Sequence, residues 1–445
     1  MGTSHRSART RRASVLCVLT VLGSLLASAC GSSGGGGSAS VAPKDVGPAS
    51  GHLTWYAINF GPEGFPQKLV DAFQRDHPGI TVTYQAAPNN TDTMRATLTT
   101  EISGGSGSID VYNGDVVWPA QFGKASLAMP LDAHLPDGYW DRFPRERADI
   151  AEYRGEHIGA PLYVDAGLMY YRKDLLDKHH LPVPKTWEEL KRTAARLQRS
   201  GDVRYGYVAQ WANYEGLTVD WTEMSAAAGG RTVSRDGRRP AIDSPENRRV
   251  LRFMRDMLDE GVAPSAITSF QEQQSLQTFV EGDAAFHRNW AYAYGEANNP
   301  KTSQVVGKVG IAPLPAFDGE KGPGKSAAGG WNLMVNPHSD AIGAALTFIR
   351  WMTGEKAQRM LAENGVIPAR SDVLHDEDLQ RGNPALKAAA DAPLVSRPSG
   401  IARYAQLSHG VYTNVNGSLA GSASPGSALH AAAEDIERVL EGRAL

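Results

Sequence analysis

Acidic or amide side chains recur beside aromatic rings in five stretches of this 445-residue chain. The stretch NFGPEGF contains Asn59 and Glu63 in a Gly/Pro-rich loop, and YNGDVVWP contains Asp115 and Trp118. Carboxylates accept paired hydroxyl groups, while flat rings stack on C–H faces, and a neutral sugar presents both kinds of surface. The other three stretches are PLYVDAGLMYYR, HRNWAYAYG and GGWNLMVN.

Each of these signals has an ordinary structural explanation. A tryptophan belongs to a core or a rim more often than to a ligand platform. Glu63 or Asp165 could equally cap a helix or pair with an arginine, and Arg288 could be purely structural. The recurrence in five separate loops is what favours a shared binding site.

The stretch GEKGPGKS, residues 319–326, fits the nucleotide-binding pattern of glycine, four residues and Gly-Lys-Ser. That pattern cradles phosphate only where it follows a buried strand and opens a helix. Here a proline-containing segment precedes it, and two glycines with alternating apolar residues follow it. We therefore interpret it as a solvated loop that leads into a strand.

Cysteine usage and charge exclude several other classes of protein. The two cysteines, Cys17 and Cys30, both precede the expected folded body, which excludes disulfides, cysteine metal sites and cysteine nucleophiles there. No HExxH motif or EF-hand loop occurs, so we expect neither a metal nor a cofactor. The formal charge is −3, and −7 without the four N-terminal arginines, which argues against nucleic-acid binding.

The N-terminal segment has the features of a secretory signal. Arginines precede an apolar run over residues 15–27, and small residues precede Cys30. We predict a signal peptide at residues 1–29, a lipid on Cys30 and a Gly/Ser/Pro-rich tether over residues 30–51. The protein is then expected on the outer face of the cytoplasmic membrane, and an ordinary cleaved signal is the alternative.

Strands and helices alternate in the segment that must position these residues. Leu53–Ile58 and Ile80–Tyr84 predict strands on either side of an amphipathic helix that begins near Phe65. A helix near Asp92–Ser103 precedes a further strand at IDVYN. This spacing indicates βαβ units, a largely parallel sheet and an α/β fold.

Helix caps are clearest in the middle of the chain. Thr186 and Glu189 form a capping box, and Ser244 precedes Pro245 at the start of another helix. Further amphipathic helices are expected within SDAIGAALTFIRWMTG and SALHAAAEDIERVLEG. Roughly four hundred residues from His52 onward exceed what one core normally holds, so we expect two domains.

Taken together, these motifs resemble an extracellular solute-binding protein (family 1) of bacterial carbohydrate ABC importers, most similar to the trehalose/maltose-binding branch. The similarity covers essentially the whole mature body, through VDAFQRDHPGITVTY, GAPLYVDAGLMYYRKDLL, FVEGDAAFHRNWAYAY and SRPSGIARYAQLS. It implies a two-lobed periplasmic-binding-protein fold (type II) with the ligand cleft between lobes joined by hinge segments. Lobe 1 would comprise residues 52–162 plus 312–365, and lobe 2 residues 163–311 plus 366–445.

The resemblance also implies which residues hold the ligand. Glu63 and Asp115 would accept sugar hydroxyls, and Arg95 would donate to one. Trp290 would stack on one ring, with Trp331 on the other. The full implied set is Glu63, Arg95, Asp115, Tyr163, Asp165, Trp290, Tyr292, Gly330, Trp331 and Arg397.

The function that the resemblance implies is capture and delivery without bond breaking. A monomeric lipoprotein would bind an α-linked disaccharide, such as trehalose or maltose, by hinge closure and deliver it to the permease of an ABC importer. One alternative is a secreted carbohydrate-active hydrolase, which also combines carboxylates with tryptophans. The other is a binding protein for a polyamine or an iron complex, which would suit the acids but not Arg95 and Arg397.

Overall fold

The computed structural model describes residues 46–443, so the signal peptide and the lipidation of Cys30 lie outside the described residues and stay predictions. Within this range no helix combines the length and the apolar character that crossing a membrane requires.

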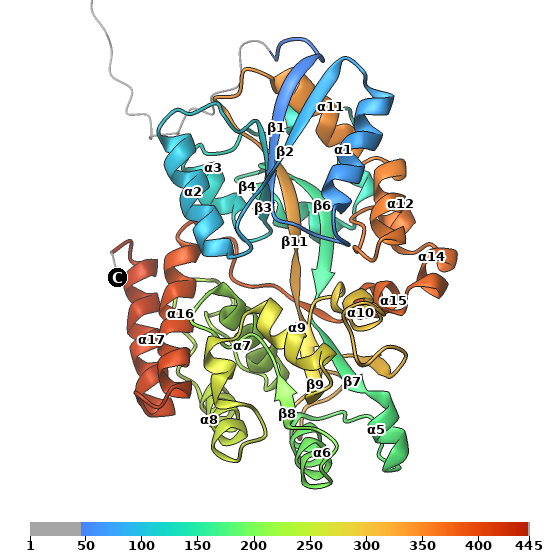
Figure 1. The fold of residues 1–445 in the computed structure, drawn as a ribbon. Helices are drawn as coiled ribbons and strands as arrows, with labels where there is room; N and C mark the ends of the chain where they lie inside the picture. Colours follow the sequence, from blue (N-terminus) through green and yellow to red (C-terminus); the bar gives the residue numbers. More distant parts are fainter. Residues whose placement is uncertain (1–45, 444–445) are drawn as a thin grey trace, which may run out of the picture. The chain divides into compact units, whose positions relative to one another are not determined.

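Two β-sheets organise the chain (Figure 1). The first has the order β12-β11-β3-β1-β2, with β6 also paired to β11. Its strands are β1 Gly51–Ala57, β2 Ile80–Ala86, β3 Val111–Asp115, β6 Ala160–Ala166, β11 Ser326–Val335 and β12 Leu394–Val395. The second has the order β10-β7-β9-β8. Its strands are β7 Leu168–Arg172, β8 Tyr205–Val208, β9 Ala284–Asn289 and β10 Val309–Ala312.

Helices follow or separate these strands, and a short two-stranded ribbon of β4 (Glu152–Tyr153) and β5 (Glu156–His157) lies apart from both sheets. The helices up to the end of β9 are α1 Phe65–Asp76, α2 Thr91–Ser103, α3 Pro119–Lys124, α4 Arg145–Ile150, α5 Lys173–Lys178, α6 Trp187–Arg199, α7 Glu215–Ala227, α8 Pro245–Asp259 and α9 Glu272–Val280. Those after it are α10 Ala293–Ala297, α11 Ile342–Met352, α12 Glu355–Glu363, α13 Ser371–Leu374, α14 Glu377–Gly382, α15 Pro384–Asp391, α16 Tyr404–Leu419 and α17 Pro425–Leu440.

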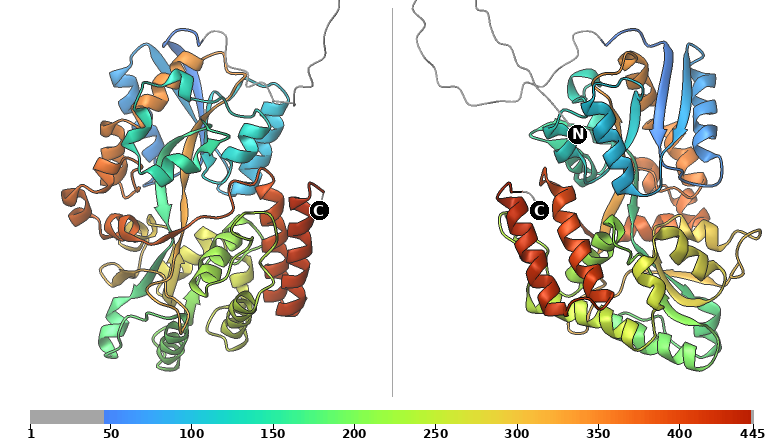
Figure 2. Two further views of the ribbon diagram at one scale, coloured as in Figure 1. Left: turned by 180° about the vertical axis from the view of Figure 1, so that it is seen from behind. Right: turned by 60° about the vertical axis from the view of Figure 1, so that its left-hand side comes forward.

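The predicted start of the fold is confirmed. Strand β1 pairs in parallel with β2 on one side and with β3 on the other. Right-handed crossovers that step in opposite directions place their helices on opposite faces, and Figures 1 and 2 show α1 and α2 arranged in this way. The ends of β1 and β3 consequently flank a crevice where the strand order reverses, which is where open α/β sheets bind ligands.

The parallel pairing predicted from residues 53–115 does not extend to the second sheet. Only β8 and β9 run parallel there, because β7 pairs antiparallel with both β9 and β10. In the first sheet β11 also runs antiparallel to β3 and β6. These strands come from distant parts of the chain, so local strand–helix spacing carries no information about their direction.

The two predicted helix starts are confirmed by their hydrogen bonds. The Thr186 hydroxyl accepts the N–H of Glu189 at 3.2 Å, and the Glu189 carboxylate accepts the N–H of Thr186 in return. The Ser244 hydroxyl accepts the N–H of Asn247 at 3.3 Å at the start of α8. Each cap satisfies backbone donors that the first helical turn leaves free.

The loop interpretation of residues 319–326 is also confirmed. Gly319 and Gly322 have φ of 93° and 81°, a left-handed conformation that suits a turn. Ser326 is the first residue of strand β11, so no helix starts after Lys325 to present its N–H groups to a phosphate.

Two large buried clusters form the core: one surrounds the first sheet and extends onto one face of the second, and the other covers the opposite face of the second sheet. One contains Trp55, Phe73 and Phe348, and the other contains Trp187 and Trp221. The chain passes from the first sheet to the second at Gly167, between β6 and β7, and returns between β10 and β11. The predicted divisions at residues 162 and 312 fall within a few residues of these passages, and the lobe boundaries stay a proposal.

Candidate functional site

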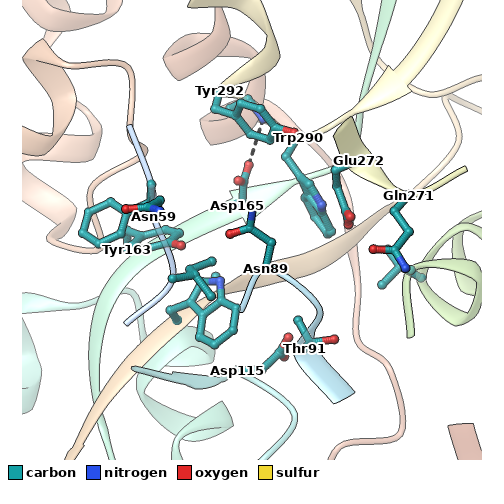
Figure 3. A pocket seen from close by; sticks show the side chains of 18 of the residues that line it. Asn59, Asn89, Thr91, Asp115, Tyr163, Asp165, Gln271, Glu272, Trp290 and Tyr292 are labelled. Atoms are coloured by element: carbon teal, nitrogen blue, oxygen red, sulfur yellow. Dashed lines mark hydrogen bonds between the residues drawn. The ribbon is translucent and has the colours of Figure 1, made fainter. Parts of the chain in front are cut away.

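A cavity of about 410 Å³ lies where the strands of the first sheet end. Asn59 lines it from the loop after β1, Asp115 from the end of β3 and Asp165 from β6. Glu215, at the start of α7, and Trp290, directly after β9, line it from segments that follow strands β8 and β9 of the second sheet. Figure 3 shows the side chains of Asp115, Asp165 and Trp290 around one common space.

Eight of the ten residues predicted as ligand contacts line this cavity. They are Asp115, Tyr163, Asp165, Trp290, Tyr292, Gly330, Trp331 and Arg397. Their positions span residues 115 to 397, so only the folded chain brings them together. Whether each of them contacts a ligand stays a proposal.

Glu63 and Arg95 do not belong to the cavity wall. Glu63 is exposed in the turn before α1, and Asn59, at the start of the same loop, faces the cavity instead. Arg95 donates to Asp92, one turn earlier on α2, at 3.3 Å. Other residues of the same loop and helix, Asn59 and Thr91, line the cavity, because side-chain direction within each element depends on the tertiary packing.

Several residues that line the cavity were not predicted from the sequence. They are Asn89, Thr91, Tyr214, Glu215, Glu272 and Glu296, together with the glutamines Gln271, Gln273 and Gln274. The run QEQQ at the start of α9 was the one local signal, since four polar residues precede the apolar positions Leu276 and Phe279. No local pattern marked Glu215 as a wall residue, because its neighbours Tyr214 and Gly216 are typical of an ordinary turn.

Asp165 holds its position through two backbone groups. Its Oδ1 accepts the N–H of Ala166 at 2.9 Å and the N–H of Ala291 at 3.1 Å. Burial raises the pKa of Asp165 to about 6, although these two hydrogen bonds act in the opposite direction. The carboxylate is therefore an ionised and oriented acceptor at neutral pH.

Trp290 has a guanidinium over one face of its ring and a glycine at the outer edge of the ring. The Arg288 guanidinium lies 4.3 Å from the centre of the Trp290 ring, within the range of a cation–π contact. Next to the ring is Gly329 of β11, where a Cβ atom would lie 2.6 Å from the indole. The absence of a side chain at Gly329 therefore lets the ring lie against the strand.

The interpretation of Arg288 as structural is supported by its surroundings. It is 2% exposed and donates to both carboxylate oxygens of Glu223, at 2.7 and 2.5 Å, while Asp220 lies 3.2 Å away. The same Glu223 accepts the N–H of Ala327 at the start of β11. Arg288 thus supports Trp290 from behind and ties α7 to the segment that leads into the first sheet.

Arg397 connects two acids across the cavity. It donates to Oδ1 of Asp115 at 3.1 Å and to Oε1 of Glu215 at 2.7 Å. Glu215 also accepts the hydroxyls of Tyr404 and Ser408, each at 2.5 Å. These contacts leave Nε of Arg397 buried without a hydrogen-bond partner within the described residues.

A metal centre finds no support between residues 46 and 443, where no group of three or more His, Cys, Asp or Glu side chains could hold an ion. The cavity instead combines carboxylates, amides and rings. This set can accept hydroxyl hydrogen bonds and stack on apolar sugar faces.

Known proteins with similar sequences are solute-binding proteins. The family model for bacterial extracellular solute-binding proteins matches residues 61–359. A probable ABC transporter-binding protein of Deinococcus radiodurans is 31% identical over 408 residues, covering 87% of this chain and 93% of the relative. A mannitol-binding protein of Pseudomonas aeruginosa is 27% identical over 301 residues, covering 67% of each chain.

Solved structures show the same likeness. Maltose-bound MalE3 of T. maritima has a TM-score of 0.81 and 29% identity, covering 87% of this chain and 99% of that one. The GacH receptor of Streptomyces glaucescens, solved unliganded and with acarbose, has a TM-score of 0.79 and 25% identity, covering 88% of this chain and 99% of that one. The expected two-lobed fold is confirmed by these matches.

Proposed function

Because this chain belongs to the bacterial extracellular solute-binding protein family, we propose that it captures a neutral sugar and delivers it to the permease of an ABC importer. An α-linked disaccharide such as maltose or trehalose is the proposed ligand. Capture occurs by closure of the two lobes about their connecting segments, and no bond of the sugar is broken. Lipid attachment through Cys30, a monomeric state and a place on the outer membrane face are parts of the same proposal.

One observation carries the choice of a sugar. Acids, amides and two tryptophan rings from separate segments line one cavity, and three buried polar atoms of wall residues, Thr91 Oγ1, Tyr292 Oη and Arg397 Nε, have no partner within the described residues. Buried polar groups are normally paired, so a ligand with several hydroxyls would complete them. The similar structures with bound maltose and acarbose support the same class.

Calorimetric titration against a panel of maltose, trehalose, sucrose and mannitol tests this proposal. We expect saturable binding of at least one disaccharide in the micromolar range, about −8 kcal/mol. Release of glucose from the sugar by pure protein would instead support the hydrolase. Absence of binding to every member of the panel would contradict the proposal.

A cationic solute is a second candidate, because the structure removes the objection raised by the two arginines. Arg95 lies outside the wall, and Arg397 is already paired with Asp115 and Glu215. Glu272 and Glu296 add further negative charge to the cavity. Titration with spermidine tests this candidate, since binding driven by charge should weaken as salt increases.

Replacing Glu63 tests whether the ligand contacts the cavity wall or the loop residue that the sequence motif suggested. We expect Glu63→Gln to keep the disaccharide affinity within about twofold of the parent, because its exposed carboxylate is outside the wall. Asn59→Ala in the same loop removes a wall amide and should weaken binding about tenfold. Calorimetry checks both, and a large loss for Glu63→Gln alone would place the sugar against the turn before α1.

Replacing Asp165 with asparagine is expected to raise the stability of the protein at neutral pH and to weaken sugar binding. A carboxyl whose folded-state pKa is raised destabilises the folded protein as pH rises through about 6, since the folded state retains the proton longer than the unfolded chain. Asp165→Asn should therefore melt at a higher temperature than the parent at pH 7.5, and at the same temperature at pH 3. Its disaccharide affinity at pH 7.5 should be about tenfold weaker, because an amide replaces an ionised acceptor. Thermal scans and titrations at several pH values check this, and equal melting at pH 7.5 would contradict it.

A further inference from the structure

Helix α7 begins without a capping side chain of its own. Tyr214 is its N-cap residue and makes no side-chain capping hydrogen bond. The N–H of Glu215, the first helical residue, donates instead to Oδ2 of Asp92 at 3.3 Å. Asp92 lies in the first turn of α2, 123 residues earlier in the chain. The negative group at the α7 N-terminus is therefore supplied by a distant helix.

This contact joins the two halves of the molecule. Helix α2 lies between β2 and β3 of the first sheet in the chain, whereas α7 lies between β8 and β9 of the second sheet. Met94 and Leu98 of α2 and Leu217 and Trp221 of α7 belong to different buried clusters. A hydrogen bond between α2 and α7 can form only while the two halves are as close as they are in this structure. Asp92 is thus a capping residue whose contact depends on the arrangement of the lobes.

The neighbours of Asp92 hold its carboxylate in place. Its Oδ1 accepts from Arg95 at 3.3 Å, which leaves Oδ2 directed to α7. This is a specific role for Arg95, which the sequence had suggested as a sugar donor. An anionic side chain at a helix N-terminus is favourable, because the first N–H groups of a helix have no partners within it.

A second bridge ends on the same residue of α7. The Glu215 side chain accepts from Arg397, and Arg397 donates to Asp115 of the first sheet. The backbone of Glu215 is thus bound by Asp92, and its side chain is linked to Asp115 through Arg397. Asp115, Glu215 and Arg397 line the cavity, whereas Asp92 does not.

We propose that Asp92 is a clasp between α2 and α7, which favours the closed arrangement and so controls affinity without contacting the ligand. A ligand that binds only the closed form has its apparent affinity reduced by the fraction of protein that is open. Loss of the clasp raises this open fraction. The effect on sugar affinity rests on the proposed function, but the effect on closure does not.

The first experiment measures closure in ligand-free protein. The full chain carries Cys17→Ser and Cys30→Ser, with label sites at Lys68→Cys on α1 and Arg192→Cys on α6, both at exposed positions. We expect Asp92→Ala to shift the distance distribution between the labels toward longer values. Asp92→Asn keeps an oxygen acceptor, and Asn caps helices as well as Asp, so its distribution should match the parent. Glu101→Ala, which removes an exposed acid from the same helix, is the matched control and should also match.

The second experiment measures binding of the disaccharide that the parent prefers. For Asp92→Ala we expect Kd to rise about three- to tenfold, mainly through faster dissociation, while Asp92→Asn stays within about twofold. An unchanged distance distribution in Asp92→Ala would overturn the clasp, and so would an Asp92→Asn variant as open as Asp92→Ala. If the parent binds no sugar, the proposed function fails while the distances still decide whether the clasp exists.

Discussion

Trp290→Ala is expected to weaken disaccharide binding about 100-fold, the largest loss that we expect from a single change in the cavity wall. Stacking a sugar face on an indole removes on the order of 100 Å² of apolar surface from water, worth about 2.5–3 kcal/mol, or two decades in Kd. The expectation is specific to this ring because Arg288 and Gly329 hold it in one orientation. The side chain is therefore preorganised, and ligand binding does not have to fix its rotamer.

Calorimetry of three variants tests this expectation. Trp290→Phe keeps a flat ring and should lose about fivefold or less of the affinity. Trp351→Phe is the control, since its indole donates to Asp76 and lies outside the cavity wall. A Trp290→Ala variant that binds as tightly as the parent would show that the sugar does not stack on this face, and the proposed ligand pose would be wrong.

Arg288→Met is expected to lower the free energy of unfolding by about 3–5 kcal/mol. The side chain is fully enclosed, and its removal leaves Glu223 and Asp220 buried without their positive partner. Burial already raises the pKa of Asp220 well above its usual range. Without Arg288 the loss of stability should be greater at pH 8 than at pH 5, because a buried carboxyl can take up a proton at the lower pH.

Chemical unfolding checks the Arg288 prediction. Arg381→Met is the matched control, since its pairs with Glu377 and Asp378 are exposed and should contribute almost nothing. Adding Glu223→Gln and Asp220→Asn to Arg288→Met should recover part of the lost stability, because no unpaired charge then remains. Unfolding of Arg288→Met at the parent's denaturant concentration would contradict the buried network.

Much of the fold follows from local signals along the chain. The periodicity of residues 53–115 predicted β1, α1, β2, α2 and β3 in the right order, and the caps at Thr186 and Ser244 marked two helix starts. These signals work because a cap or an amphipathic face is decided by residues three or four positions apart. The same reasoning rejected a phosphate loop at Lys325, since the following residues form β11.

The sequence predicted the kinds of side chain that line the cavity, but not the full set of residues. The recurrence of acids and amides beside aromatic rings in five loops predicted a shared site, and the loop after β1 and the end of β3 do line one cavity. The roles of Glu63 and Arg95 in the ligand site found no support, since side-chain direction depends on packing partners. Glu215 was missed because its partners, Asp92, Arg397, Tyr404 and Ser408, are all more than 100 residues away.

By itself, the sequence determined which residue types are available and which local elements carry them: strands ending in acids and amides, tryptophans after glycines or a strand, and well-capped helices. Only the tertiary structure decided which acids face one cavity and which are already paired. It also decided that β7 runs antiparallel to β9 and β10, that β11 runs antiparallel to β3 and β6, and that Asp92 caps a helix it does not belong to. The physical reason is range: caps and periodicity act within a turn or two, whereas burial, strand direction and ion pairing depend on contacts between residues far apart in the chain.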